Sequence, residues 1–123
     1  MQLEFLNSVV DIRGRILFCK YGDLSFNILE TKKGFSRGGH FHNFHSTHYL
    51  IKGKIIFKTF DLNSKNEQIT KFFAPSEINV SANIAHILTA LTDSIFIEFF
   101  DQKYSAIDYL PYRNLIKGQL ENS

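Results

Sequence analysis

Four of the five histidines lie within nine residues, and this cluster is the clearest chemical signal in the sequence. In an extended strand, residues two apart point to the same face, so His40 and His42 project together and can converge on one bound atom or one substrate. The fifth histidine, His86, lies in a second short segment that we expect to fold back onto the first. The segment with the cluster reads Arg37-Gly38-Gly39-His40-Phe41-His42-Asn43-Phe44-His45-Ser46-Thr47-His48.

A histidine pair of this kind suits two different chemistries. Neutral imidazole is a good ligand for zinc, iron, copper or nickel. An ordinary pKa near about 6.5 also lets one ring accept a proton while another donates one close to neutral pH. The spacing does not distinguish these uses, and a turn at positions 43–46 would send His45 and His48 to opposite sides or out to solvent.

Composition bounds the class of protein. A length of 123 residues predicts one domain over 1–123, and 44% hydrophobic with 21% charged residues is ordinary for a soluble protein. The net charge of +2 comes without a basic run, so we expect no nucleic-acid partner and no membrane. The single cysteine, Cys19, excludes an internal disulfide. The first residues do not resemble a signal peptide, so a cytoplasmic location is expected.

Short apolar runs separated by Gly, Pro, Asn and Asp predict an antiparallel sandwich or barrel. Apolar residues on both sides of Gly53 favour a hairpin there. A helix is expected only in the tail, 107–120, where Pro111 limits it. The segments expected to form strands are 9–18, with a turn at Asp11-Ile12-Arg13-Gly14, and 24–29, 49–51, 55–57, 69–73, 84–88 and 94–100.

Two motifs resemble those of the cupins, in which a His-x-His with a following Glu and a later Pro-x-Gly-x-x-His converge inside a small barrel. The residues that carry this resemblance are Gly34, His40-x-His42, Gly53 and Ser81-x-Asn83-x-x-His86. The resemblance implies an all-β, cupin-type antiparallel β-sandwich or barrel, a jelly roll with a short irregular or helical C-terminal tail. Ser46 stands where the metal-binding glutamate would be. Asn83 replaces the glycine, and Asn is the best other residue for a left-handed turn.

A narrower resemblance is to the small cupins that act on nucleotide-linked 4-keto-6-deoxy sugars. It is closest to the dTDP-sugar 3,4-ketoisomerases and more distant from the 3,5-epimerases. The residues that carry it are Asp11-x-Arg13-Gly14, the segment 33–42, Tyr104 and Asp108-Tyr109. This resemblance implies a homodimer, a nucleoside-diphosphate sugar as substrate and no cofactor in the chemistry. By position, His40 and His42 match the active-site histidines, and Arg37 matches the arginine that precedes them.

The residues suit such an isomerase. Moving a carbonyl between adjacent sugar carbons requires a base, an acid and a group that stabilises the enolate oxygen. His40 and His42 can share the acid and base work, Tyr49 or Tyr104 can donate a proton, and Arg37 can hold the oxyanion or the diphosphate. We expect His86 to contact the substrate as well. Three further cations can meet the diphosphate: Arg13, Arg15 and Lys54.

Two other functions fit the same residues. One is a metal-dependent, dioxygenase-like cupin in which His40, His42 and His86, together with His48, hold one divalent transition metal. The other is a cupin that binds a sugar without converting it. The sequence therefore predicts a nucleotide-sugar isomerase or epimerase first, with these two functions as alternatives.

Overall fold

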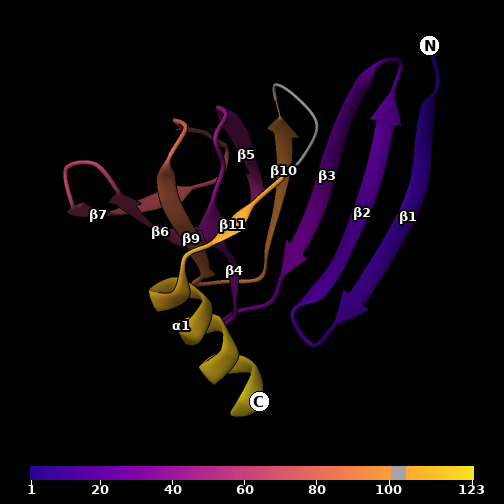
Figure 1. The fold of residues 1–123 in the computed structure, drawn as a ribbon. Coiled ribbons are helices and arrows are strands. Elements are labelled where there is room, and N and C mark those ends of the chain that lie inside the picture. The colour runs from indigo at the N-terminus through magenta and orange to yellow at the C-terminus, as the bar shows by residue number, and fades with distance from the viewer. Residues whose placement is uncertain (101–104) are drawn as a thin grey trace.

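Two antiparallel sheets and one C-terminal helix form the computed structural model, which describes residues 1–100 and 105–123 (Figure 1). The sheets stack face to face, and α1 lies across one end of the second sheet. The first sheet has the order β1 (Leu3–Asp11), β2 (Gly14–Tyr21), β3 (Leu24–Thr31), β10 (Ser94–Phe100), β5 (Ser46–Lys52) and β8 (Ser76–Val80). The second has the order β11 (Ile107–Asp108), β4 (Ser36–Phe41), β9 (Ile84–Ala90), β6 (Lys54–Asp61) and β7 (Asn66–Phe73).

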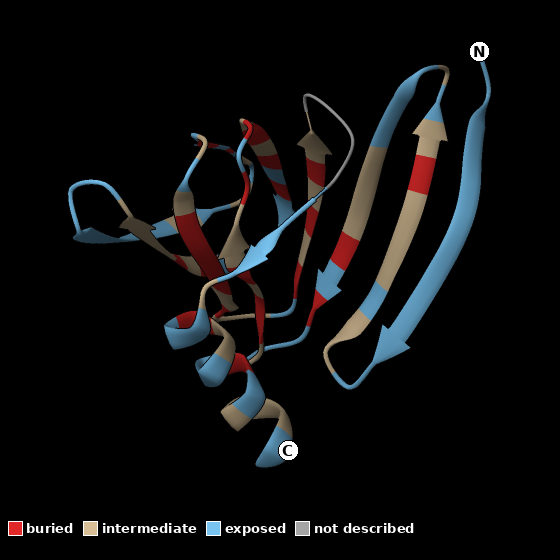
Figure 2. Cartoon of the chain, in the orientation of Figure 1, coloured by how far each residue is buried: buried red, intermediate tan, exposed pale blue. Residues whose placement is uncertain are grey.

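The main core lies between the two sheets. Alternate residues along each strand point inward, and the apolar ones meet there. Figure 2 shows the buried positions gathered on the central strands, while β1 is exposed along its whole length. The all-β prediction is therefore confirmed. The buried core residues are Leu29, Leu50, Ile55, Phe57, Ile78, Val80, Leu88 and Phe96.

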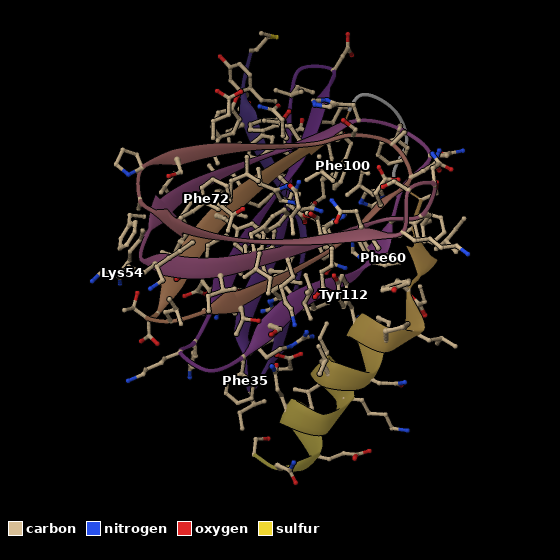
Figure 3. The ribbon with its side chains drawn as sticks, turned by 90° about the vertical axis from the view of Figure 1, so that its left-hand side faces the viewer. Phe35, Lys54, Phe60, Phe72, Phe100 and Tyr112 are labelled. Atoms are coloured by element: carbon tan, nitrogen blue, oxygen red, sulfur yellow. The ribbon has the colours of Figure 1, made fainter. Side chains whose placement is uncertain are left out.

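The tail forms the expected helix, α1 (Leu110–Glu121). Pro111 stands in its first turn, where a residue without a backbone N–H costs nothing, so the proline starts the helix rather than limiting it. Tyr112 and Ile116 pack against the outer side of β9, and Figure 3 shows Tyr112 between α1 and the strands. No helix in the described part of the chain is long and apolar enough to span a membrane.

The hairpin predicted at Gly53 is wrong. β5 pairs with β10 and β8, whereas β6 pairs with β9 and β7, so the chain passes from one sheet to the other at Gly53. Gly53 has φ 96°, a conformation that lets the backbone turn this corner. Among the described strands, β5 pairs only with ones that are distant in sequence, whereas β6 pairs with the next strand, β7, and with the distant β9. The local pattern around Gly53 does not reveal these partners.

A β-bulge in β4 aligns the residues of the site. Arg37 pairs with Leu88 and His40 pairs with His86, with a register shift between Gly38 and His40. Leu88 and His86 are two apart in β9 and share its inner face. Arg37 and His40 therefore both face inward although they are three apart, because the bulge adds one residue to β4.

Substitution of Gly38 tests this bulge. Gly38 has φ 99°, and a Cβ there would lie 2.9 Å from the carbonyl oxygen of His86. We expect Gly38→Ala to lower the free energy of unfolding by about 2–3 kcal/mol, from backbone strain and this clash. Urea unfolding measures the loss. Gly118→Ala is the control, since Gly118 is helical with nothing within 4 Å, and we expect it to be neutral or stabilising by about 0.5–1 kcal/mol. Equal stability of the two variants would contradict this account of the bulge.

Candidate functional site

Three histidines meet on the inner face of the second sheet. His40 lies in β4, His42 follows that strand directly, and His86 lies opposite His40 in β9. One ring nitrogen from each lies within 4.8 Å of the others. The ring centroid of His40 lies 4.7 Å from the ring centroid of His42 and 4.9 Å from that of His86. Three imidazoles this close can share one bound ion.

A backbone contact joins the two segments that carry these histidines. The N–H of Asn83 donates to the carbonyl oxygen of His42 at 2.7 Å. Asn83 has φ 65°, which confirms that it takes the left-handed turn ahead of His86. The expectation that the second segment folds back onto the first is correct, and this turn is what directs β9 into place.

Hydrogen bonds to backbone carbonyls fix the protonation of two of the rings. Nδ1 of His42 donates to the carbonyl oxygen of Ser105 at 2.6 Å, and Nδ1 of His86 donates to that of Ile84 at 3.1 Å. In a neutral imidazole the other nitrogen, Nε2, then carries the lone pair. Nε2 of His86 is buried and makes no hydrogen bond within the described part of the chain. In His86 one nitrogen is thus anchored and the other is left for a ligand, which is the arrangement that metal-binding histidines adopt.

Burial keeps the three rings neutral. It lowers the pKa of His40 to about 4, with a further contribution from the neighbouring His42. Burial also lowers the pKa of His42, and it lowers that of His86 well below its ordinary value. Neutral rings are ready to bind a metal. A ring with a pKa of about 4 is a weak general base near neutral pH, where catalysis favours a matched pKa.

A buried acid that the sequence analysis missed lies beside the three histidines. Glu98 in β10 is the cross-strand neighbour of His48 in β5, and Nε2 of His48 donates to its Oε2 at 2.9 Å. Burial alone would raise the pKa of Glu98, but the hydrogen bond and the charge of His48 outweigh burial and lower it. Glu98 therefore remains a carboxylate. The sequence could have identified Glu98 as an inward acid. It is the only charged residue of β10, and it lies two residues after Phe96, which also points inward.

Ser46 stands in β5 where the cupin motif would place a glutamate. It lies in β5, two residues before His48 and on the same inward face, and it is only 1% exposed. Its Oγ is buried and makes no hydrogen bond to any described residue. Ser46 carries a hydroxyl and no carboxylate, so the acidic group beside His48 comes from the adjacent strand, as Glu98.

A cavity of about 900 Å³ opens in front of these residues. His40, His48, His86 and Glu98 line one part of it, and phenylalanines from both sheets supply much of the apolar wall. His42 belongs to the histidine cluster but is only 2% exposed and does not line the cavity. Ligand pockets usually have volumes of about 300–1,000 Å³, so the cavity is large enough for a small organic ligand. The phenylalanines of the wall are Phe18, Phe26, Phe57, Phe96 and Phe100.

Three arginines line the cavity, Arg13, Arg37 and Arg113, and the first two are close enough to repel each other. Arg37 is 5% exposed, and its guanidinium donates to the carbonyl oxygen of Glu30 at 2.7 Å and to Oγ1 of Thr31 at 3.3 Å. Burial, with repulsion from Arg13, lowers the pKa of Arg37 to about 10, so it is still charged at neutral pH. Arg13 is held by Asp11 at 2.7 Å. A buried cation beside a second cation favours an anion.

Three further predicted site residues are not brought to the cavity. Tyr49 follows the inward His48 and so points to the outer face, where its ring packs on Phe99 at 5.6 Å. Arg15 is exposed and does not line the cavity. Lys54 lies over the ring of Phe73 at 5.7 Å, at the edge of the strands (Figure 3). Tyr104 lies outside the described residues.

The two stacked sheets, with inward histidines from β4 and β9 around a cavity, define a cupin-type jelly roll. No family model and no curated protein matches the sequence. Solved structures do match. One is CapF, the capsular polysaccharide assembling protein of Staphylococcus aureus, with a TM-score of 0.72 and 18% identity over 83% of this chain and 30% of CapF. Another is a mutant of Bacillus subtilis oxalate decarboxylase, with a TM-score of 0.74 and 17% identity over 83% of this chain and 29% of that protein. The chain thus spans about a third of the length of these proteins, and at this identity the likeness concerns the fold.

The histidine cluster predicts acid sensitivity of the metal-free protein. The pKa of His40 is about 4 in the folded chain against 6.5 when unfolded, so the unfolded state binds its proton first as the pH falls. The stability that neutral His40 provides is therefore complete above about pH 6.5 and declines below it, by about 2–3 kcal/mol once the pH reaches 4. Urea unfolding with a chelator, from about pH 7 to pH 5, measures this decline.

His40→Asn is the control for this prediction, because an amide does not titrate in this range. We expect the decline between about pH 7 and pH 5 to be smaller in His40→Asn than in the wild type. The same pH dependence in both proteins would show that His40 is not held neutral by burial.

Proposed function

We propose that this chain is a metal-dependent cupin enzyme that binds one divalent transition metal on His40, His42 and His86. The observation that carries the proposal is the convergence of one nitrogen from each ring within 4.8 Å, with two of the rings anchored through Nδ1. Imidazole ligands suit zinc, iron, copper and nickel, and three protein ligands leave a coordination position open for substrate. Such an ion supplies Lewis-acid chemistry, polarising a bound substrate oxygen.

The other residues of the cavity suit an anionic substrate. Arg37 is buried and charged, and the bulge in β4 turns it toward the same cavity as His40. Its guanidinium can bind a carboxylate or phosphate through two parallel hydrogen bonds. The oxalate decarboxylases that share this fold act, by their name, on a small dicarboxylate. We therefore propose a substrate with an anionic group held by Arg37 and a second oxygen that reaches the three histidines.

Titration with Co²⁺ tests the metal site without knowledge of the substrate. We expect the chelator-treated protein to bind one equivalent of Co²⁺, which visible absorption will show. At a free Co²⁺ concentration of a hundred times Kd, the free energy of unfolding should rise by about 2.7 kcal/mol. His86→Ala should weaken binding at least about a hundredfold, because it removes a direct ligand. His45→Ala is the matched control, since His45 lies outside the cluster, and it should bind as the wild type does. Failure to bind at about 1 mM Co²⁺, or equal weakening in both variants, would contradict the proposal.

A second function is favoured by the size and charge of the cavity. A volume of about 900 Å³ is large enough for a nucleoside-diphosphate sugar. The described part of the wall contains three acids, Asp23, Glu98 and Asp108, and also three arginines that can meet the diphosphate, Arg13, Arg37 and Arg113. The segment from Arg37 to His42 resembles that of the dTDP-sugar ketoisomerases, and CapF is named for capsular polysaccharide assembly. In this proposal His40, which lines the cavity, moves the proton next to the carbonyl, and His42 supports it from the adjacent ring. Tyr104 can donate, and no metal is needed.

Proton NMR in deuterated water separates the two functions. The chelator-treated protein is incubated with dTDP-4-keto-6-deoxyglucose, and exchange at the carbons beside the carbonyl is followed. An isomerase should give exchange without metal, and His40→Asn should slow it at least about a hundredfold, the usual contribution of a general acid or base. Absence of exchange in protein that is folded and binds Co²⁺ would contradict the isomerase and leave the metal-dependent function.

A further inference from the structure

A row of three polar side chains crosses the inner face of the first sheet. Glu98 in β10 is paired with Asn27 in β3 on one side and with His48 in β5 on the other. Residues paired across neighbouring strands point to the same face, so the three side chains lie side by side. All three line the cavity. The row ends at apolar residues, since Asn27 pairs next with Phe18 and His48 pairs next with Ile78.

Glu98 is the hydrogen-bond acceptor at the centre of this row. Nε2 of His48 donates to its Oε2 at 2.9 Å, and the side chain of Asn27 hydrogen-bonds to it as well. Two neighbours that hold one carboxylate keep it ionised and fix its direction. A tenth of the Glu98 side chain is still exposed, and this residue lines the cavity. Because a carboxylate has about four lone-pair sites, Glu98 can accept a further hydrogen bond from a ligand.

The charge of Glu98 acts on the groups of the second sheet that the proposed function uses. Burial lowers the pKa values of Arg37, His40 and His42, and the negative charge of Glu98 opposes this effect at all three. Such an effect requires the carboxylate to lie near these side chains, because the interaction of two charges falls with distance. The cavity therefore has an anion-binding arginine on one sheet and a fixed negative charge on the other.

This arrangement discriminates between two kinds of anionic ligand. A small dicarboxylate with one end on Arg37 would bring its second carboxylate against Glu98, and the two negative charges would repel each other. A hydroxyl in the same place would donate to Glu98 instead. The oxygen of that hydroxyl can also be the second substrate oxygen that reaches the three histidines.

The surroundings of the polar row are suited to an apolar group. Phe96 lies two residues before Glu98 on the same face of β10, and Leu29 lies two residues after Asn27 on the same face of β3. Both line the cavity, as Phe18 does. Walls of this kind bind the apolar body of a ligand, while the few polar groups fix its orientation.

We propose that Glu98 selects the substrate, and that this substrate is a hydroxy acid with an apolar side group. The carboxylate binds to Arg37, the hydroxyl donates to Glu98, and the apolar group packs against the wall of the first sheet. His48 and Asn27 position the Glu98 carboxylate. This inference rests on the proposed function, because it takes Arg37 as the anion site and identifies the second substrate oxygen as a hydroxyl.

Three acids with the same skeleton test the inference. Phenylacetate, mandelate and phenylmalonate carry a hydrogen, a hydroxyl or a second carboxylate on the same carbon, and calorimetric titration of chelator-treated protein near neutral pH gives their affinities. We expect mandelate to bind at least about tenfold more tightly than either of the others, the usual effect of one hydrogen bond to a charged group. Equal affinities, tightest binding of phenylmalonate, or no binding of any of them at about 10 mM would overturn the inference. These outcomes need no variant.

Glu98→Gln removes the charge but keeps the size of the side chain and an acceptor for His48. We expect this variant to bind phenylmalonate at least about tenfold better relative to mandelate, because an amide does not repel a second carboxylate. Glu77→Gln is the matched control, since Glu77 is exposed on β8 and does not line the cavity, and it should keep the wild-type order. The wild-type order in Glu98→Gln would overturn the role of Glu98.

Arg37→Gln separates this inference from the proposed function. It should weaken the binding of all three acids alike, because they share the carboxylate that Arg37 holds. Equal affinities in the wild type together with loss of binding in Arg37→Gln would overturn only the role of Glu98. Binding that is unaffected by Arg37→Gln would contradict the anion site of the proposed function, and the Co²⁺ titration reports on the metal site independently.

Discussion

The pairing of β4 with β9 determines where the polar groups of this protein lie. Each strand would otherwise follow simple alternation, with one face toward the other sheet and one toward α1. The bulge at Gly38 and Gly39 shifts β4 by one residue, so that Arg37 joins His40 on the inner face. The same pairing places His40 opposite His86, and the turn at Asn83 ties the start of β9 to His42. The three histidines, the buried arginine and the cavity depend on this one alignment.

This alignment is costly for the isolated chain. A buried polar atom without a hydrogen bond costs about 1–3 kcal/mol, and the cluster includes Nε2 of His86, while Nδ1 of the adjacent His48 also makes no bond to a described residue. Phenylalanine or leucine at these positions would fill the same space with no polar atom to satisfy. A protein that holds such groups in its interior loses stability unless a ligand satisfies them, so the site is better explained by binding than by packing.

The parts of the structure that follow local rules could be predicted from the sequence. Short apolar runs bounded by turn residues identified most strands. Period-two alternation identified the shared face of His40 and His42, and the properties of Asn identified the turn at Asn83. The same alternation also places His48 and Tyr49 on opposite faces, so Tyr49 could have been set aside. The orientation of Arg37 could not be predicted, because a bulge depends on the strand alongside. The corner at Gly53 could not be predicted either, since β5 pairs, among the described strands, only with β10 and β8, which are distant in sequence, and not with β6.

The position of Glu98 bears on the kind of substrate that the site would accept. Its carboxylate lies in β10 and is engaged by His48, and it is not among the groups that converge with His40, His42 and His86. Ser46 supplies no carboxylate from β5. A divalent ion on the three imidazoles would have no carboxylate ligand from position 46, but the carboxylate of Glu98 would act on it from beside the cluster, as it acts on His40 and His42. The substrate preference proposed above therefore rests on Arg37, the buried cation of the cavity, rather than on the residue at position 46.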